Sequence, residues 1–357
     1  MHVFVTGGTG QTGPAIVTEL VGSGHQVTGL ARSDASAARL EALGATPLRG
    51  SLEDTDVLAS GASEADGVVH MANGGDFSDP ASMTRREVTA INALGEALVR
   101  TGRPFLSTSG TLVLPAGRVS AEGDAPDPRS IGSLRIPGEQ ACLGFAEQGV
   151  RAVVVRLAPT VHGPRDHGFI PLLIARARAT GVSAYVGDGA NRWPAVHRLD
   201  AADLYRLALE KAPAGHVVHG VGESAVPFRS IAEKIGDELG LPVRSVSAED
   251  AGEHFGNPIM AVVSAPTHLP PATTHGSCST GRRTTPPCST TSERATTSTP
   301  DPDQRARHVQ PRCRPPTGLA ELSRRGPGRP ELLRLYRQIG NIIRSRQQAE
   351  GWGGGPG

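Results

Sequence analysis

A chain of 357 residues with 38% hydrophobic and 20% charged residues is long enough to bury one or two full cores. No apolar run approaches the ~20 residues that a membrane span needs, and the start lacks the basic segment of a signal peptide. Four cysteines at spacings of 136, 10 and 25 match no disulfide or metal framework, so we predict a cytoplasmic protein without a metal site.

Strand-like and helix-like stretches alternate from residue 2 to about residue 160. "HVFVTGG" and "HQVTGLAR" are predicted strands on either side of an amphipathic helix at 13–23. The apolar runs "ADGVVHMAN", "RPFLSTSG" and "RAVVVRLAP" follow as further strands. Such runs separated by helical patterns indicate a parallel sheet covered on both faces, a Rossmann-type doubly wound α/β fold. Further on, 198–211 and 227–240 are predicted helices, and "LPVRSVS" is a last short strand.

The first strand runs into a glycine-rich turn whose spacing suits a nucleotide phosphate. Residues 6–13 satisfy T-G-x-x-G-x-x-G, and Gly8 adds the pattern G-x-G-x-x-G. Glycines without Cβ atoms let the backbone approach a pyrophosphate, and the helix that begins near Gln11 points its free N–H groups at the anion. The residues predicted to bind a dinucleotide here are Gly7, Gly10, Gln11, Thr12 and Gly13.

The end of the second strand bears on the choice between NAD and NADP. An acidic residue about 20 positions beyond the glycines would bond the ribose 2′-OH of NAD. This chain has Ala31 there, followed by Arg32 and Ser33. A guanidinium and a hydroxyl suit a 2′-phosphate, so NADP is the preferred cofactor. The alternative is that Arg32 is a solvated surface residue.

These residues resemble the extended and atypical short-chain dehydrogenase/reductases, the NAD(P)-dependent epimerase/dehydratase-like proteins. The segments that carry the resemblance span about residues 1–262 and are "TGGTGQTG", "RGSLED", "VVHMA", "STSGT", "VVVRLAPTVHGP" and "RWPAVHRLDAADL". The resemblance implies that Ser51 and Leu52 lie near the adenine and that Met71 and Ala72 run beneath the cofactor. It also implies that Pro159, Thr160 and Val161 lie near the nicotinamide.

The chain departs from this family at the pair that usually performs its chemistry, Tyr-x-x-x-Lys, whose Tyr is the acid/base. Its three tyrosines, Tyr185, Tyr205 and Tyr336, are followed four residues later by Gly, Leu and Gly. Aligning the helix before the sixth strand places Ile131 at the Tyr position and Arg135 at the Lys position. One atypical subgroup resembles this chain in carrying His-x-x-x-Arg, of which only the Arg is present here.

Other side chains are candidates for the missing tyrosine's role. Ser109 and Thr111 follow the fifth strand, where the family keeps a hydroxyl that polarises the substrate oxygen; the alternative for Ser109 is a hydroxyl that bonds to local backbone. His162 is a candidate because histidine as a residue type titrates near neutrality; the alternative is a loop histidine bonded to backbone. Arg135 would hold the ribose and stabilise an oxyanion. Asn73, Trp193 and His197 are predicted on the substrate side.

The last part of the chain has a different composition. Residues 265–330 contain no aromatic residue, no Ile and no Lys, so we expect a disordered tail. From Ser264 onward the charge is +8, which leaves −7 for the body and makes a nucleic-acid surface there unexpected. Because a shifted reading frame would supply Leu, Trp, Tyr and Phe, we interpret the tail as a frameshift near residues 258–267.

The predicted organisation is a nucleotide-binding domain at 1–160, completed by about 196–220, a mainly substrate-side subdomain at 161–262, and the tail at 263–357. The predicted function is an NADP(H)-dependent oxidoreductase or epimerase/dehydratase-type enzyme acting on a small carbonyl, alcohol or sugar-like substrate. The alternative, favoured by the missing tyrosine, is a non-catalytic NADP(H)-binding redox sensor. The expected partners are a small molecule, no nucleic acid and no membrane, with a homodimer as one alternative for the assembly.

Overall fold

The fold is described by a computed structural model over residues 1–73, 79–164 and 166–256. The predicted disordered tail at 263–357 and the proposed change of frame near 258–267 lie outside these residues. Among the helices described, none combines the length and the hydrophobicity needed to cross a bilayer.

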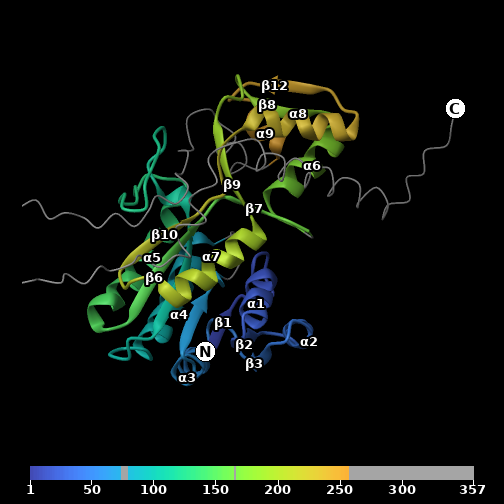
Figure 1. Cartoon of the computed structure of the whole chain (residues 1–357). Coiled ribbons are helices and arrows are strands. Elements are labelled where there is room, and N and C mark those ends of the chain that lie inside the picture. The colour runs from blue at the N-terminus through green and yellow to red at the C-terminus, as the bar shows by residue number, and fades with distance from the viewer. Residues whose placement is uncertain (74–78, 165, 257–357) are drawn as a thin grey trace, which may run out of the picture. The chain divides into compact units, whose positions relative to one another are not determined.

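A seven-stranded parallel sheet forms the centre of the fold, as predicted (Figure 1). Its strand order is β10-β6-β5-β4-β1-β2-β3. The strands are β1 (His2–Thr6), β2 (Gln26–Ala31), β3 (Thr46–Arg49), β4 (Gly67–His70), β5 (Pro104–Gly110), β6 (Arg151–Leu157) and β10 (His216–Gly220). The order reverses between β1 and β4, and in open parallel sheets ligands bind at the carboxyl ends of the strands at such a switch point.

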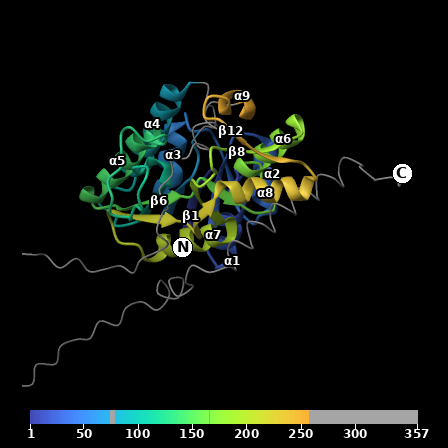
Figure 2. The same cartoon turned by 90° about the horizontal axis from the view of Figure 1, so that it is seen from above.

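Helices cover both faces of the sheet, because its central strands are apolar on both sides. On one face, α1 (Gly13–Gly22), α2 (Asp34–Ala42) and α7 (Arg198–Lys211) bury Ile16, Leu40 and Tyr205. The other face carries α3 (Thr55–Glu64), α4 (Pro80–Glu96) and α5 (Ile136–Gly144). Figure 2 shows α4 beside α5. The thiol of Cys142 on α5 is fully buried in this second core, and burial raises its pKa to about 12.

Besides α7 and β10, the described chain after the sixth strand forms two small sheets and three helices. A three-stranded sheet has the order β11-β9-β7, from β7 (Thr160–His162), β9 (Arg192–His197) and β11 (Glu223–Pro227). A two-stranded parallel sheet joins β8 (Ser183–Val186) to β12 (Val243–Val246), the predicted last strand. The helices are α6 (Phe169–Thr180), α8 (Phe228–Leu239) and α9 (Ala251–Phe255). This part has an apolar core of its own, and the predicted domain boundary near residue 160 stays a prediction.

Short 3-10 turns link the larger elements. They are η1 (Thr111–Val113), η2 (Ser133–Arg135) and η3 (Phe145–Gln148). The turn η2 leads directly into α5, which begins at Ile136 with a proline in its first turn. Proline is favoured there because the first helical N–H has no partner in the helix. Arg135 is therefore held at the point where the chain enters α5.

Candidate active site

A cavity of about 470 Å³ opens at the carboxyl ends of the central strands. The glycine-rich turn forms one wall, and residues after β2, β3 and β4 form the others. The lining residues are Gly7, Thr9, Gly10, Gln11, Thr12, Gly13, Leu30, Arg32, Ser33, Ser36, Leu52, Glu53, Met71, Ala72, Asn73, Arg86, Thr108, Leu157 and Tyr205. This is the place where the fold puts a dinucleotide.

Two glycines of the turn are required by close backbone approach. Gly7 has φ +76, and a Cβ there would lie 2.8 Å from the backbone nitrogen of Ala72. A Cβ on Gly13 would lie 2.2 Å from the carbonyl oxygen of Gly7. No side chain fits at either position, so the backbone of the turn stays open to a phosphate at the start of α1. The chain therefore carries a cradle that fits the pyrophosphate of a dinucleotide.

The side chain of Gln11 connects this cradle to the segment after β7. Its Nε2 donates to Oδ1 of Asp166 at 2.6 Å and to the carbonyl oxygen of Val161 at 3.2 Å. The backbone nitrogen of Gly168 donates to the same carboxylate oxygen at 2.7 Å. Burial raises the pKa of Asp166. Gln11 thus lines the cavity, while its side-chain amide donates to Val161 and Asp166, which are not part of the lining.

The residues after β2 lie where the adenosine ribose of a dinucleotide would be. Ser33 begins α2 in a capping box: its Oγ accepts from the backbone nitrogen of Ser36 at 3.2 Å. Arg32 is exposed, lines the cavity, and has no hydrogen bond or ion pair with any described residue. The nearest acidic residue along the chain, Asp34, pairs with Arg49 at 3.0 Å.

The other predicted cofactor residues divide into two groups. Leu52, Met71 and Ala72 line the cavity, and so does the predicted substrate residue Asn73. Ser51 does not line it, because its hydroxyl accepts a bond from the backbone nitrogen of Glu53 at 3.2 Å. The three residues predicted near the nicotinamide, Pro159, Thr160 and Val161, also lie outside the lining, to which the end of β6 contributes Leu157.

Three hydroxyl side chains lie at the end of β5: Ser109 and Thr111 are buried without a partner among the described residues, and Thr108 makes two hydrogen bonds. Ser109 and Thr111 are 6% and 2% exposed, and neither side-chain oxygen has a hydrogen-bond partner among residues 1–73, 79–164 and 166–256. Thr108 directly precedes Ser109 in the chain and lines the cavity. Its Oγ1 donates to the carbonyl oxygen of His70 at 2.9 Å and accepts from the hydroxyl of Tyr205 at 2.7 Å.

Arg135 lies against the same strand. Its Nη2 donates to the carbonyl oxygen of Thr108 at 2.5 Å and is 3.1 Å from Oε1 of Glu87 on α4. Its Nη1 is buried without a partner in the described part of the chain. Burial raises the pKa of Glu87 to about 7, although the Arg135 charge acts in the opposite direction. Ile131, at the position of the family's tyrosine, packs instead on the core around Trp193.

The predicted substrate-side aromatic and histidine residues lie on the small three-stranded sheet. His162 is fully buried, its Nε2 is 3.4 Å from Oε2 of Glu223, and its ring packs edge-on against that of His197. Trp193 is 1% exposed and stacks on Phe169 with ring centroids 4.2 Å apart. His162, Trp193 and His197 do not line the 470 Å³ cavity, so the catalytic role of His162 and the substrate role of the other two stay predictions.

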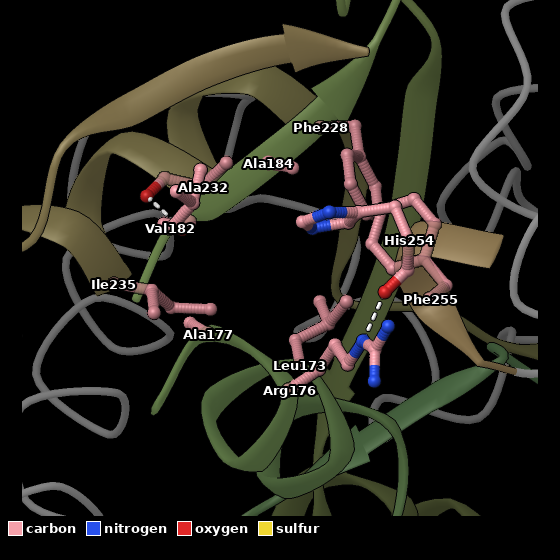
Figure 3. Close-up of a pocket in the computed structure, with 11 residues that line it drawn as sticks. Leu173, Arg176, Ala177, Val182, Ala184, Phe228, Ala232, Ile235, His254 and Phe255 are labelled. Carbon is pink, nitrogen blue, oxygen red and sulfur yellow. Dashed lines mark hydrogen bonds between the residues drawn. The ribbon is translucent and has the colours of Figure 1, made fainter. Parts of the chain in front are cut away.

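A second, much smaller pocket lies among α6, α8 and α9 (Figure 3). It has a volume of about 10 Å³, and its walls are mostly apolar side chains such as Leu173, Phe228 and Phe255. Arg176 reaches across it and donates to the carbonyl oxygen of His254. A space of this size holds at most one water molecule, so this pocket is a packing gap and not a binding site.

The sequence did not single out several residues of the cavity and its surroundings. Glu87 lies on α4 outside every motif, and Tyr205 on α7 directly follows the segment "RWPAVHRLDAADL". Arg86 pairs with Glu53 at 2.9 Å, and both line the cavity. The described residues contain no group of three or more His, Cys, Asp or Glu side chains placed to hold a metal ion.

Comparison with known families decides the class of the protein. The model of the NAD dependent epimerase/dehydratase family matches residues 3–220. The chain belongs to this family. Among its relatives, an uncharacterised protein of Schizosaccharomyces pombe is 49% identical over 258 residues, which are 72% of this chain and 86% of that protein. A second uncharacterised protein, from Saccharomyces cerevisiae, is 45% identical with the same coverage.

More distant relatives of this chain have names that state an activity. A farnesyl-dihydroquinoline-oxide ketoreductase of Stigmatella aurantiaca is 28% identical and matches 72% of this chain and 80% of its own. Among solved structures, the UDP-glucose 4-epimerase of Thermotoga maritima is 22% identical with a TM-score of 0.58, covering 69% of this chain and 85% of the other. At that identity the likeness shows the fold.

Proposed function

We propose that this family member is an NADP(H)-dependent oxidoreductase or epimerase/dehydratase-type enzyme that acts on a small carbonyl, alcohol or sugar-like substrate. The family model and the cavity at the switch point of the sheet support a dinucleotide-dependent enzyme. The relatives whose names state an activity are enzymes, such as the ketoreductase above and a UDP-glucose 4-epimerase of Streptomyces lividans. They give the redox-sensor alternative no support.

The observation that carries the preference for NADP is the guanidinium of Arg32. It lines the cavity, it is exposed, and no described carboxylate neutralises it. Arg forms bidentate, charge-assisted bonds to phosphates. Ser33 and Ser36 line the same wall of the cavity as Arg32 and add two hydroxyls to it. A 2′-phosphate would therefore gain contacts here that a 2′-hydroxyl would not.

A bound NADP(H) would supply or accept a hydride at C4 of its nicotinamide. The chain's own residues must orient the substrate oxygen and stabilise the charge that develops on it. Ser109 and Thr111 are proposed as the donors, since their buried hydroxyls have no partner within the described residues. Arg135 is proposed to hold the ribose. Its Nη2 donates to the carbonyl oxygen of Thr108 on β5, whereas its Nη1 has no partner among the described residues.

The proton that accompanies the hydride needs a different group, since a guanidinium is a poor proton donor. His162 is the proposed acid/base. We propose that the segment 161–262 forms the substrate side around it, with Asn73, Trp193 and His197 as contacts. His162 faces Glu223 with Nε2 3.4 Å from Oε2, and an imidazole can both accept and donate a proton.

The test is to follow NADPH absorbance against a panel of aldehydes, ketones and nucleotide sugars, with NADH in parallel. Turnover of a carbonyl substrate with NADPH preferred over NADH is the expected result. Tight NADPH binding without turnover across the panel would contradict the enzyme proposal and leave only cofactor binding. Equal use of NADH and NADPH would contradict the preference for NADP.

A further inference from the structure

A carboxylate lies in the middle of the apolar side of helix α4. Met83, Ala90, Ile91 and Leu94 are buried on that side at helical spacing, and Glu87 lies among them with 2% of its surface exposed. A charged side chain is rarely buried to that extent unless it has a partner. Its partner is Arg135, which reaches it from η2 with Nη2 3.1 Å from Oε1.

Glu87 restrains a guanidinium whose side chain is only 17% exposed. Nη2 of Arg135 is held between Oε1 of Glu87 and the carbonyl oxygen of Thr108. Thr108 lines the cofactor cavity, so this restraint holds Arg135, which is not itself in the lining, one hydrogen bond behind a lining residue. The second terminal nitrogen, Nη1, is buried and makes no bond to any described residue. A donor restrained in this way is available to a ligand without further loss of side-chain entropy.

We propose that Glu87 is a positioning residue that fixes the guanidinium of Arg135 toward the bound dinucleotide, and that the site requires its negative charge and not only its shape. This inference rests on the proposed NADP(H) site. It assigns a role to a residue outside every motif of the chain. Glu87 does not touch the cavity itself and acts only through Arg135.

The other charged groups near this pair are accounted for. Glu139 on α5 acts on Glu87 as a like charge, and it is itself bonded to Arg156 of β6 at 2.7 and 2.9 Å. On the other side of Arg135, burial lowers the pKa of His70 to about 3 and raises the pKa of Tyr205, so both are neutral at physiological pH. Arg135 therefore depends on Glu87 for its nearest negative charge.

The arrangement has a pH-dependent consequence. Burial raises the pKa of Glu87 to about 7, so the carboxylate takes up a proton as the pH falls through that value. Protonation removes the ion pair with Arg135 and releases the guanidinium from its restrained position. Affinity for NADPH should therefore be highest above about pH 7 and fall below it.

The experiment measures NADPH affinity by fluorescence between about pH 6 and pH 8. The proteins compared are the unmodified one, Glu87→Gln, Arg135→Gln and the double variant. Glu139→Gln is the matched control, because it replaces a carboxylate that is equally buried and also paired with an arginine. Circular dichroism checks that each variant is folded. Titration of the cofactor's own 2′-phosphate is common to all and cancels in the comparison.

The unmodified protein should lose affinity as the pH falls through about 7, and Glu87→Gln should bind about tenfold more weakly at the upper pH with no such transition. Glu139→Gln should keep the transition with its midpoint moved to lower pH, because a like charge is gone. The double variant should bind no more weakly than Arg135→Gln alone, since Glu87 acts only through Arg135.

A transition in Glu87→Gln identical to that of the unmodified protein would overturn this proposal while leaving the proposed function intact. Additive losses in the double variant would overturn it in the same way. If the unmodified protein bound neither NADPH nor NADH at any pH, the proposed function would fall and this proposal with it.

Discussion

The side-chain amide of Gln11 donates a 2.6 Å hydrogen bond to the carboxylate of Asp166, which joins the glycine-rich turn to the segment that leads into α6. The two residues are 155 positions apart in the chain. Asp166 is 7% exposed, and its second oxygen has no partner within the described ranges. The bond therefore contributes to satisfying a carboxylate that has little access to water.

Replacing Gln11 should destabilise the fold through this bond. Gln11→Ala is expected to lower the free energy of unfolding by about 1.5–3 kcal/mol, because a buried acceptor loses a donor. Urea denaturation measures the change. Gln148→Ala is the control, since that amide makes only a 3.4 Å bond to Gly144 on the exposed surface and should change stability by less than about 0.5 kcal/mol. Equal effects of the two replacements would contradict this account.

Two glycines of helix α1 should respond to alanine in opposite directions. In Gly13→Ala the new Cβ would meet the Gly7 carbonyl oxygen at 2.2 Å, so NADPH binding should be lost and stability should fall by about 1–3 kcal/mol. Gly22 has nothing within 4 Å of its Cβ position, and Gly22→Ala should stabilise by up to about 1 kcal/mol. Melting curves and NADPH titration check both. A Gly13→Ala protein that bound NADPH normally would exclude the proposed cradle.

Arg32 should determine the choice of cofactor. Arg32→Ala is expected to weaken NADPH binding about tenfold or more and to leave NADH binding nearly unchanged, because only NADPH carries the 2′-phosphate. Arg49→Ala is a suitable control: Arg49 is exposed, pairs with Asp34 at 3.0 Å and lies outside the cavity lining. Isothermal titration with both cofactors measures the ratio. An unchanged ratio in Arg32→Ala would identify Arg32 as a surface residue.

His70 should make the protein lose stability in mild acid. It is 1% exposed and bonded to Thr6 at 2.8 Å, and burial lowers its pKa from 6.5 to about 3. Between these values the unfolded chain binds the extra proton, so stability falls as the pH falls from about 6.5 toward 3. The slope from this residue is at most about 1.4 kcal/mol per pH unit.

Urea midpoints at several pH values, for the unmodified protein and for His70→Asn, measure that slope. The variant should lose the contribution of His70, whereas His216→Asn, which replaces an exposed histidine, should keep it. Equal slopes for His70→Asn and the unmodified protein would show that other groups cause the acid sensitivity.

The sequence was sufficient for the large sheet because its strands are apolar runs between helical patterns. The predicted strands, the helix at 13–23 and the helices near 198–211 and 227–240 all correspond to elements of the structure. The two small sheets were harder to predict. In the three-stranded sheet β7 has three residues, in the two-stranded sheet β8 has four, and such short segments carry little periodicity. Their pairing joins positions far apart, such as Val243 beside Ser183, which no local pattern reveals.

The part of the site that a local motif determines could be predicted from the sequence. The part that depends on contacts from helices far away in the chain could not. The glycine-rich turn is local, so its place in the cavity wall followed from spacing alone. Tyr205 and Glu87 reach the region of β5 only through the packing of α7 and α4. Glu87 nevertheless carried a signal, since it interrupts an apolar side at four residues from both Met83 and Ile91. Buried charges of that kind merit attention in sequence analysis.

The reading frame of the tail is open to a direct test. The matched 258 residues are 72% of this chain and 86% of its S. pombe relative. Resequencing the gene should reveal a base inserted or deleted near residues 258–267. A protein translated from the restored frame should melt at a higher temperature, because several apolar side chains worth ~1.5–3 kcal/mol each would be available for burial. An intact frame, or a restored protein with an unchanged melting temperature, would refute the interpretation.

The buried thiol of Cys142 can be used to measure how often the fold opens locally around α5. A thiol whose pKa is near 12 and which is fully buried in the core between α5 and the sheet reacts with an alkylating reagent only after that core opens. Cys278, Cys288 and Cys313 lie outside the described residues, so peptide mapping assigns each modification. The labelling rate of Cys142 then measures how often α5 leaves the sheet. Because Arg135 lies at the start of that helix, a ligand that engages Arg135 should slow this labelling without any change in the sequence.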